Sequence, residues 1–144
     1  MENSIMKKDD CIFCLLANGD IPTNTIYEDE EFRVIMDNAP ATKGHALVLP
    51  KNHYADIYEI DADVLGRAIQ VGQKVIKHAT KVLGCEGYNL LQNNGEVAGQ
   101  TIFHFHLHLI PRYADMDNSQ ILKAPATEAD ADALKALCES LKVE

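Results

Sequence analysis

The chain has 144 residues, of which 47% are hydrophobic and 24% charged, and its formal net charge is −9 at pH 7. This length fits one domain, and the ordinary apolar fraction predicts a globular fold. The acidic balance, without a visible basic patch, argues against a nucleic-acid partner, and no stretch approaches the ~20 apolar residues that a membrane span needs.

The N-terminal half of the chain predicts a short helix followed by three strands. Residues 1–10 carry charges and no long apolar run, so we expect a flexible N-terminus, no signal peptide or anchor, and a cytoplasmic protein. The apolar stretch 11–18 indicates one or two helical turns. Strands are expected at 25–28, 32–37 and 45–50, with an acidic hairpin turn at 29–31 and a loop at 38–44.

A long amphipathic helix is predicted next. Apolar residues recur every three or four positions between Asp61, a suitable N-cap, and Gly84, a suitable helix end. Gly72 lies inside this helix and lowers its propensity by about 1 kcal/mol relative to alanine. We therefore expect a neighbouring element to approach the helix closely at Gly72.

The C-terminal half predicts two more strands and a second helix. Strands are expected at 87–92 and 101–111, with a glycine-bearing loop at 93–100 between them and a surface loop at 112–125 after them. A helix over 127–142 follows, with Thr127 as its N-cap. Its apolar face carries Leu134, Leu137, Cys138 and Leu141.

The order of elements predicts an α+β fold with a five-stranded antiparallel sheet. Both helices can then cover one face of that sheet. We expect residues 114–144 to complete the same domain.

Three histidines alternate with apolar residues in the last predicted strand. Because successive side chains of a strand point to opposite faces, His104, His106 and His108 are expected to share one face. Phe105 and Leu107 then point into a core. This places a row of imidazoles, which can donate, accept, attack or bind metal near neutral pH, on one surface.

Three interpretations of the histidine row remain open. It is a solvated strand face, although such faces usually carry lysine, glutamate and threonine. Alternatively, two or three imidazoles hold a catalytic metal that keeps an open position for water. In the third interpretation, one imidazole attacks a phosphorus or carbonyl centre and a neighbour protonates the leaving group. Glycines and polar groups of the preceding loop, which suit an anion, favour the third interpretation.

The four cysteines do not form a disulfide framework. Cys11 and Cys14 form a C-x-x-C pair, which is consistent with a redox pair, structural thiols or half of a zinc site. No βαβ pattern, typical of thioredoxin-like folds, surrounds them. Cys85 and Cys138 stand alone, and each is expected to be a small buried apolar residue.

The residues from about Asp10 to Tyr113 resemble the histidine triad (HIT) superfamily. The segment His104–Ile110 matches its alternating histidine signature, and the C-x-x-C pair, Asp37, residues 44–53 and residues 87–111 resemble the corresponding family segments. The likeness is strongest to the bacterial, zinc-bearing, Hint-like branch. Residues after Tyr113 carry no family signature.

The resemblance implies a nucleotidyl hydrolase or transferase that acts at the α-phosphate of a purine nucleotide. It implies that His106 is the nucleophile, that His108 contacts the phosphate and the leaving group, and that His45 and His104 support them. Asp37 corresponds to the carboxylate that binds the ribose hydroxyls. The groups around the phosphate correspond to Asn93, Gln100 and Thr101, and the walls of the base pocket to Phe13, Leu16 and Ile35.

The resemblance also implies a structural zinc ion and a homodimer. The implied zinc ligands are Cys11, Cys14, His53 and His104. Family dimers form through the long helix and an edge strand. The substrate is expected to be an AMP phosphoramidate or a similar ester. The alternatives are a dinucleoside polyphosphate, a nucleotide-binding regulatory protein with residual activity, and a zinc-dependent hydrolase.

Overall fold

The computed structural model describes residues 5–117 and 128–143. Five strands form one antiparallel sheet in the order β1-β2-β3-β5-β4, which confirms the predicted fold class. The strands are β1 (Thr25–Glu28), β2 (Phe32–Met36), β3 (Ala46–Pro50), β4 (Gly87–Leu91) and β5 (Leu107–Arg112). The helices are α1 (Ile12–Ala17), α2 (Ala62–Leu83) and α3 (Ala131–Leu141), with a 3-10 turn η1 (Glu96–Ala98).

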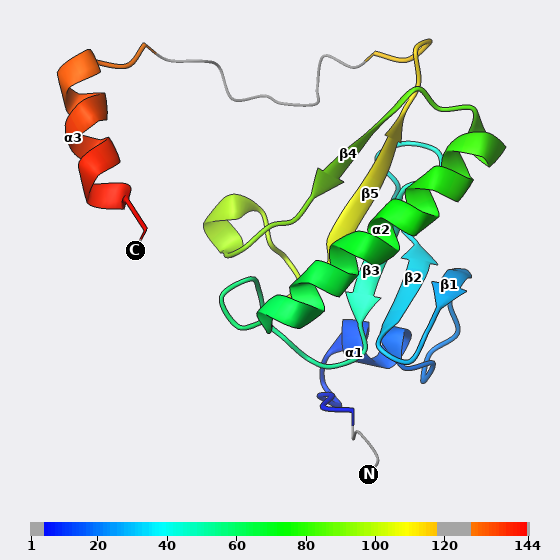
Figure 1. Ribbon diagram of the computed structural model, residues 1–144. Coiled ribbons are helices and arrows are strands. Elements are labelled where there is room, and N and C mark those ends of the chain that lie inside the picture. Colours follow the sequence, from blue (N-terminus) through cyan, green and yellow to red (C-terminus); the bar gives the residue numbers. More distant parts are fainter. Residues whose placement is uncertain (1–4, 118–127, 144) are drawn as a thin grey trace.

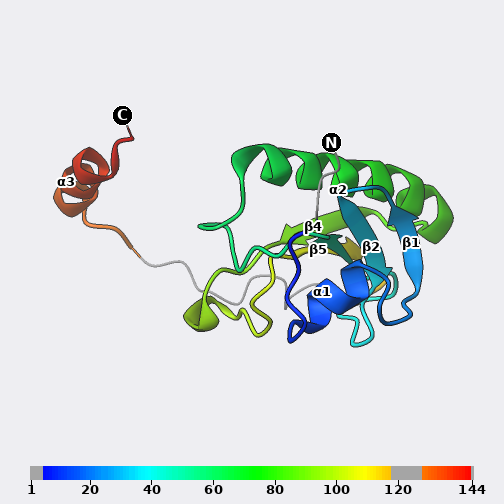
Figure 2. The same ribbon diagram turned by 90° about the horizontal axis from the view of Figure 1, so that it is seen from below.

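The helices α2 and α1 lie on opposite faces of the sheet (Figures 1 and 2). Under α2, the core is formed by one set of alternating strand residues, including Phe32, Val48 and Leu109. The other set, including Ile35 and Leu49, packs against α1. None of the described helices is long and apolar enough to cross a membrane.

The local sequence signals of α2 account for its boundaries. The helix begins after Asp61, which has an extended backbone, and ends at Gly84, whose φ of 67° is in the left-handed region that favours glycine. A Cβ built on Gly72 would lie 3.3 Å from Cδ2 of Leu109 and 3.5 Å from Cδ2 of Leu107. The predicted close approach is therefore that of β5, which carries part of the histidine row.

The predicted fifth strand, 101–111, is shorter in the structure and begins at Leu107. Its neighbour β4 ends at Leu91, which pairs with His108, and the pairing with β3 stops at Val48, opposite Leu107. Before Leu107 the chain leaves the ladder, and the backbone N–H of Phe105 donates to the carbonyl of Tyr54 instead. The alternation nevertheless holds, because Phe105, Leu107 and Leu109 enter the α2 core.

The C-terminal helix differs from the prediction in three respects. It begins at Ala131 and is capped by Asp130, whose carboxylate accepts from the backbone N–H of Ala133. The predicted cap Thr127 lies outside the described residues. Of the two helices predicted to cover one face, only α2 does so, whereas α3 buries none of its residues and lies apart from the sheet (Figures 1 and 2). Cys138 is therefore exposed, contrary to prediction, whereas Cys85 is buried as expected.

Candidate active site and metal site

Four histidines from two segments of the chain meet on the α1 side of the sheet. His108 lies in β5, His104 and His106 precede that strand, and His45 precedes β3. The ring centroids of His106 and His108 are 4.9 Å apart, and those of His45 and His108 are 5.2 Å apart. Although the strand is shorter than predicted, the structure brings these imidazoles together.

A backbone carbonyl sets the proton position on His106. Its Nδ1 lies 2.7 Å from the carbonyl oxygen of His104. A carbonyl only accepts, so Nδ1 carries the hydrogen and Nε2 keeps its lone pair. Burial lowers the pKa of His106, which keeps the ring neutral. His106 therefore has the form that a nucleophilic imidazole requires.

A second hydrogen-bond chain orders His45 and His108. The backbone N–H of Ala41 donates to Nδ1 of His45 (3.0 Å), so the hydrogen of neutral His45 is on Nε2. That Nε2 lies 3.0 Å from Nδ1 of His108, which must accept, and 3.5 Å from Oδ2 of Asp37. The hydrogen of neutral His108 is then on Nε2. Burial lowers the pKa of His108 to about 4.

The implied metal ligands also converge. One ligand atom from each of Cys11, Cys14, His53 and His104 lies within 4.8 Å of the others. Three sulfur-to-nitrogen separations fall between 3.3 and 3.5 Å. A tetrahedral zinc ion with bonds of about 2.3 Å to sulfur and about 2.1 Å to nitrogen would set such separations at about 3.5 Å. This donor set fits zinc.

The surroundings of His104 orient it as a ligand. Its Nε2 donates to the carbonyl of Pro50 (2.8 Å), so Nδ1 keeps its lone pair and faces both cysteine sulfurs. Met6 is also anchored beside this cluster, because its carbonyl accepts from the backbone N–H of His53. The flexibility predicted for residues 1–10 stays a prediction.

A cavity of about 310 Å³ lies beside α1 and β2. Two of the three predicted base-pocket residues, Leu16 and Ile35, line it. The third, Phe13, instead packs edge-on against His106, with ring centroids 4.9 Å apart. Further lining residues that the sequence did not single out are Pro22, Thr23, Asn24, Met36 and Asn38. Of these residues, only Asn38 could have been inferred from the sequence, because it directly follows Asp37.

The predicted phosphate groups differ in their surroundings. Gln100 is buried, donates to the carbonyls of Ala55 and Ile102, and accepts from the backbone N–H of Gly95. These contacts favour a role in shaping the loop over direct contact with phosphate. Asn93 is half-buried and Thr101 is exposed.

Comparison with known sequences reveals clear relatives. The profile of the HIT domain matches residues 18–115. An uncharacterized HIT-like protein of Methanocaldococcus jannaschii is 47% identical over 72% of this chain and 79% of its own length. An adenosine 5'-monophosphoramidase of Schizosaccharomyces pombe is 42% identical over 71% of this chain and 74% of its own. An adenylylsulfatase of Arabidopsis thaliana is 38% identical over 78% of this chain and 56% of its own length.

Solved structures support the same relationship. A crystal structure from Streptococcus mutans matches with a TM-score of 0.87 and 36% identity, over 94% of this chain and 85% of that chain. A zinc-bound histidine triad family protein of Mycobacterium smegmatis matches with a TM-score of 0.71 and 33% identity, over 92% and 98% of the two chains.

Proposed function

Because the chain belongs to the HIT domain family, we propose that it is a hydrolase that acts at the α-phosphate of purine nucleotides through a nucleotidyl-His106 intermediate. The observation that supports this most directly is the hydrogen bond between Nδ1 of His106 and the carbonyl of His104. It leaves Nε2 as the free nucleophilic nitrogen. The named activities of the fission yeast and Arabidopsis relatives support the same class of chemistry.

The proposed reaction has two displacements at phosphorus. In the first, Nε2 of His106 forms a bond to the α-phosphorus while the bond from phosphorus to the leaving group breaks. The Nε2–H of neutral His108 donates a hydrogen bond to the leaving group, which takes up a proton from water as it departs. In the second, water attacks the phosphorus and gives a proton to solvent, while the bond from phosphorus to Nε2 of His106 breaks and the nucleotide is released.

The remaining predicted residues form the substrate site in this proposal. The partly buried carboxylate of Asp37 accepts hydrogen bonds from the ribose hydroxyls, and the cavity lined by Leu16 and Ile35 holds the base. Asn93 and Thr101 donate to the phosphate oxygens. Gln100 acts indirectly, by holding the loop that carries Asn93.

We propose an AMP phosphoramidate as the substrate, with a dinucleoside polyphosphate as the alternative. The name of the fission yeast relative favours the former. The chain has no tryptophan, which some Hint-like proteins place near the leaving group. A regulatory protein with residual activity is less favoured, because a binding protein does not need the free Nε2 of His106.

The proposed zinc ion has a structural role. Two sulfur and two nitrogen ligands complete a tetrahedral site, whereas a catalytic zinc keeps an open position. The donor set therefore disfavours the zinc-dependent hydrolase considered above. Bound zinc would join α1, the segment after β3 and His104, and would fix the backbone that orients His106. The zinc-bound Mycobacterium smegmatis protein supports this assignment.

A homodimer completes the proposal. The outer edge of β4 is unpaired within the described chain, and it carries Leu90 and Leu91, each 44% exposed. An unpaired apolar edge is a suitable surface for a second strand.

Rapid-quench mass spectrometry during turnover of an AMP phosphoramidate tests the mechanism. The parent protein should gain one adenylyl group, mapped to the peptide that contains His106. His106→Asn should give no adduct and lose at least ~100-fold in turnover. Turnover of the variant at the parent rate would exclude His106 as the nucleophile. Circular dichroism checks that the variant is folded.

A further inference from the structure

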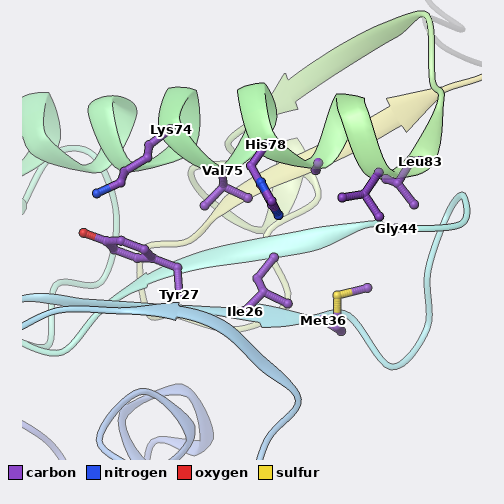
Figure 3. Close-up of a pocket in the computed structure, with 10 residues that line it drawn as sticks. Ile26, Tyr27, Met36, Gly44, Lys74, Val75, His78 and Leu83 are labelled. Atoms are coloured by element: carbon purple, nitrogen blue, oxygen red, sulfur yellow. The ribbon is translucent and has the colours of Figure 1, made fainter.

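An apolar groove lies between the C-terminal half of α2 and the β1–β2 edge, on the sheet face away from His104, His106 and His108 (Figure 3). Its volume is about 640 Å³. The α2 side chains of Val75, His78 and Leu83 point toward Ile26 and Met36 of the strands. Val82 and Ile26, which also line it, are 71% and 50% exposed. Such a surface is suited to an apolar partner.

The helix α3 has an apolar face that the described residues of its own chain leave exposed. Leu134, Leu137 and Leu141 recur at three and four residues and are 57%, 53% and 66% exposed. Isolated helices of this length are marginal in water unless an apolar face is packed. A stable α3 therefore requires a surface that packs against these leucines.

The groove and α3 match in length and in charge. Leu134 and Leu141 span the same number of residues as Val75 and Val82, about 10 Å along each helix. Residues 71–84 contain three lysines and no acidic residue, although the chain as a whole is acidic. Residues 128–143 contain four acidic and two basic residues, with three of the acids before the apolar face. The acidic N-terminal end of α3 and the lysines of α2 beside the groove therefore have complementary charges.

The position of α3 favours a groove on another molecule. Figures 1 and 2 both show α3 on the β4 side of the sheet, whereas the groove lies beside β1. A second copy placed against the free edge of β4 would lie on the side toward which α3 extends. The match to the Streptococcus mutans structure covers 94% of this chain. Residues 1–117 make up a smaller share than that, so the match extends into the C-terminal segment.

We propose that this groove is the docking site for α3 of a second copy of the chain. The leucines of α3 fill the apolar floor, and its acidic N-terminal end faces the lysines of α2. The binding mode is that of an amphipathic helix in a groove. This inference rests on the proposed homodimer but not on the proposed catalytic activity.

Disulfide trapping between two different chains tests the proposal. One chain carries Val82→Cys in the groove and Cys138→Ser in α3, and the other is the tagged parent, whose native Cys138 lies on the apolar face of α3. The two chains are co-expressed and treated with diamide, which takes up the two thiol hydrogens as the disulfide forms. We expect a linked heterodimer, with mass spectrometry joining the introduced cysteine to Cys138.

The matched control moves the introduced cysteine to the opposite side of α2. Gln73→Cys is also exposed but lies away from the groove, and it should give at least fivefold less heterodimer. Equal yields from both positions would overturn the proposal. A single chain that carries Val82→Cys and keeps native Cys138 provides a further control. It should form a disulfide-linked dimer, and an intrachain disulfide in its place would show that the groove binds the chain's own α3.

Self-association provides a second measurement. Leu137→Glu places a charge on the apolar face of α3, whereas Ala136→Glu places the same charge on the opposite face. Sedimentation analysis should show at least ~10-fold weaker dimerization for Leu137→Glu and a change within about twofold for Ala136→Glu. Equal dimerization constants for the two variants would contradict docking through the leucines.

Discussion

Nε2 of His45 lies 3.0 Å from Nδ1 of His108, although the two residues are 63 positions apart in the chain. The backbone N–H of Ala41 occupies the other nitrogen of His45. These contacts make His45 the donor and leave His108 with its hydrogen on Nε2 in the neutral form. His45 is therefore a positioning residue for His108, whose Nε2–H donates toward the leaving group in the proposed mechanism.

Removal of His45 should lower kcat more than it changes KM. His45→Ala leaves Nδ1 of His108 without its donor, and we expect kcat to fall about 10–100-fold. His45→Gln places an amide N–H near the former Nε2 and should recover part of the loss. Steady-state kinetics with an AMP phosphoramidate measures both. Equal losses in the two variants would contradict an orienting hydrogen bond.

Stability should fall with pH below about 6.5, and His108 should contribute to that loss. Its folded pKa is about 4, lowered chiefly by burial, whereas the unfolded value is near 6.5. Between these values the unfolded chain binds more protons, so the free energy of unfolding decreases as pH falls through this window. Glutamine at position 108 cannot titrate. Between pH 7.5 and 5, the free energy of unfolding of His108→Gln should therefore fall by about 1–2 kcal/mol less than that of the parent. Urea unfolding of both proteins measures the difference, and equal losses would contradict it.

The sequence predicted the helices and strands whose patterns are local. The spacing of apolar residues defined α2 between Asp61 and Gly84, and the alternation around His106 placed Phe105 and Leu107 in the core. The predicted start of β5 was wrong because it depends on where its pairing with β3 and β4 stops. A strand boundary set by neighbouring strands cannot be found from the strand's own residues.

The site was predictable in its side chains but not in its backbone contacts. The family resemblance identified the residues that converge around His106. The hydrogens on these rings depend on the Ala41 N–H and on the carbonyls of His104 and Pro50. Any residue type supplies such groups, so no residue pattern encodes them. The exposed face of α3 likewise depends on tertiary packing.

Asp37 should determine the preference for a ribose. Asp37→Asn keeps an oxygen for the backbone N–H of Ala39, which Oδ1 accepts at 2.8 Å, but removes the charge that would hold two hydroxyls. The parent should prefer an AMP phosphoramidate over its 2′,3′-dideoxy analogue by ~10–100-fold in kcat/KM, and the variant should lose most of this preference. Because the same variant is compared on two substrates, any effect of the substitution on His45 cancels in the ratio of the two kcat/KM values. A variant that keeps the parent's ratio would exclude Asp37 from ribose binding.

Two glycines of α2 should respond oppositely to alanine. A Cβ at Gly66 meets no atom within 4 Å, so Gly66→Ala should raise the free energy of unfolding by about 0.5–1 kcal/mol through helix propensity. At Gly72 the methyl group would press on the fully buried Leu109. Gly72→Ala should therefore be neutral or destabilising by up to ~1 kcal/mol. Chemical denaturation compares them, and an equal gain in both would contradict the close packing.

Purified protein should contain about one zinc ion per chain, held by the C-x-x-C pair. Cys14→Ser removes a buried sulfur that faces both His53 and His104, so we expect less than ~0.2 zinc per chain and lower thermal stability. Cys138→Ser changes an exposed cysteine outside the cluster and should keep the metal. Elemental analysis and thermal unfolding, with and without a chelator, measure both variants. A chelator should lower the melting temperature of the parent and of Cys138→Ser but not that of Cys14→Ser, because only the first two hold zinc to lose. Parent protein with no zinc, or Cys14→Ser with a full complement, would exclude this ligand set.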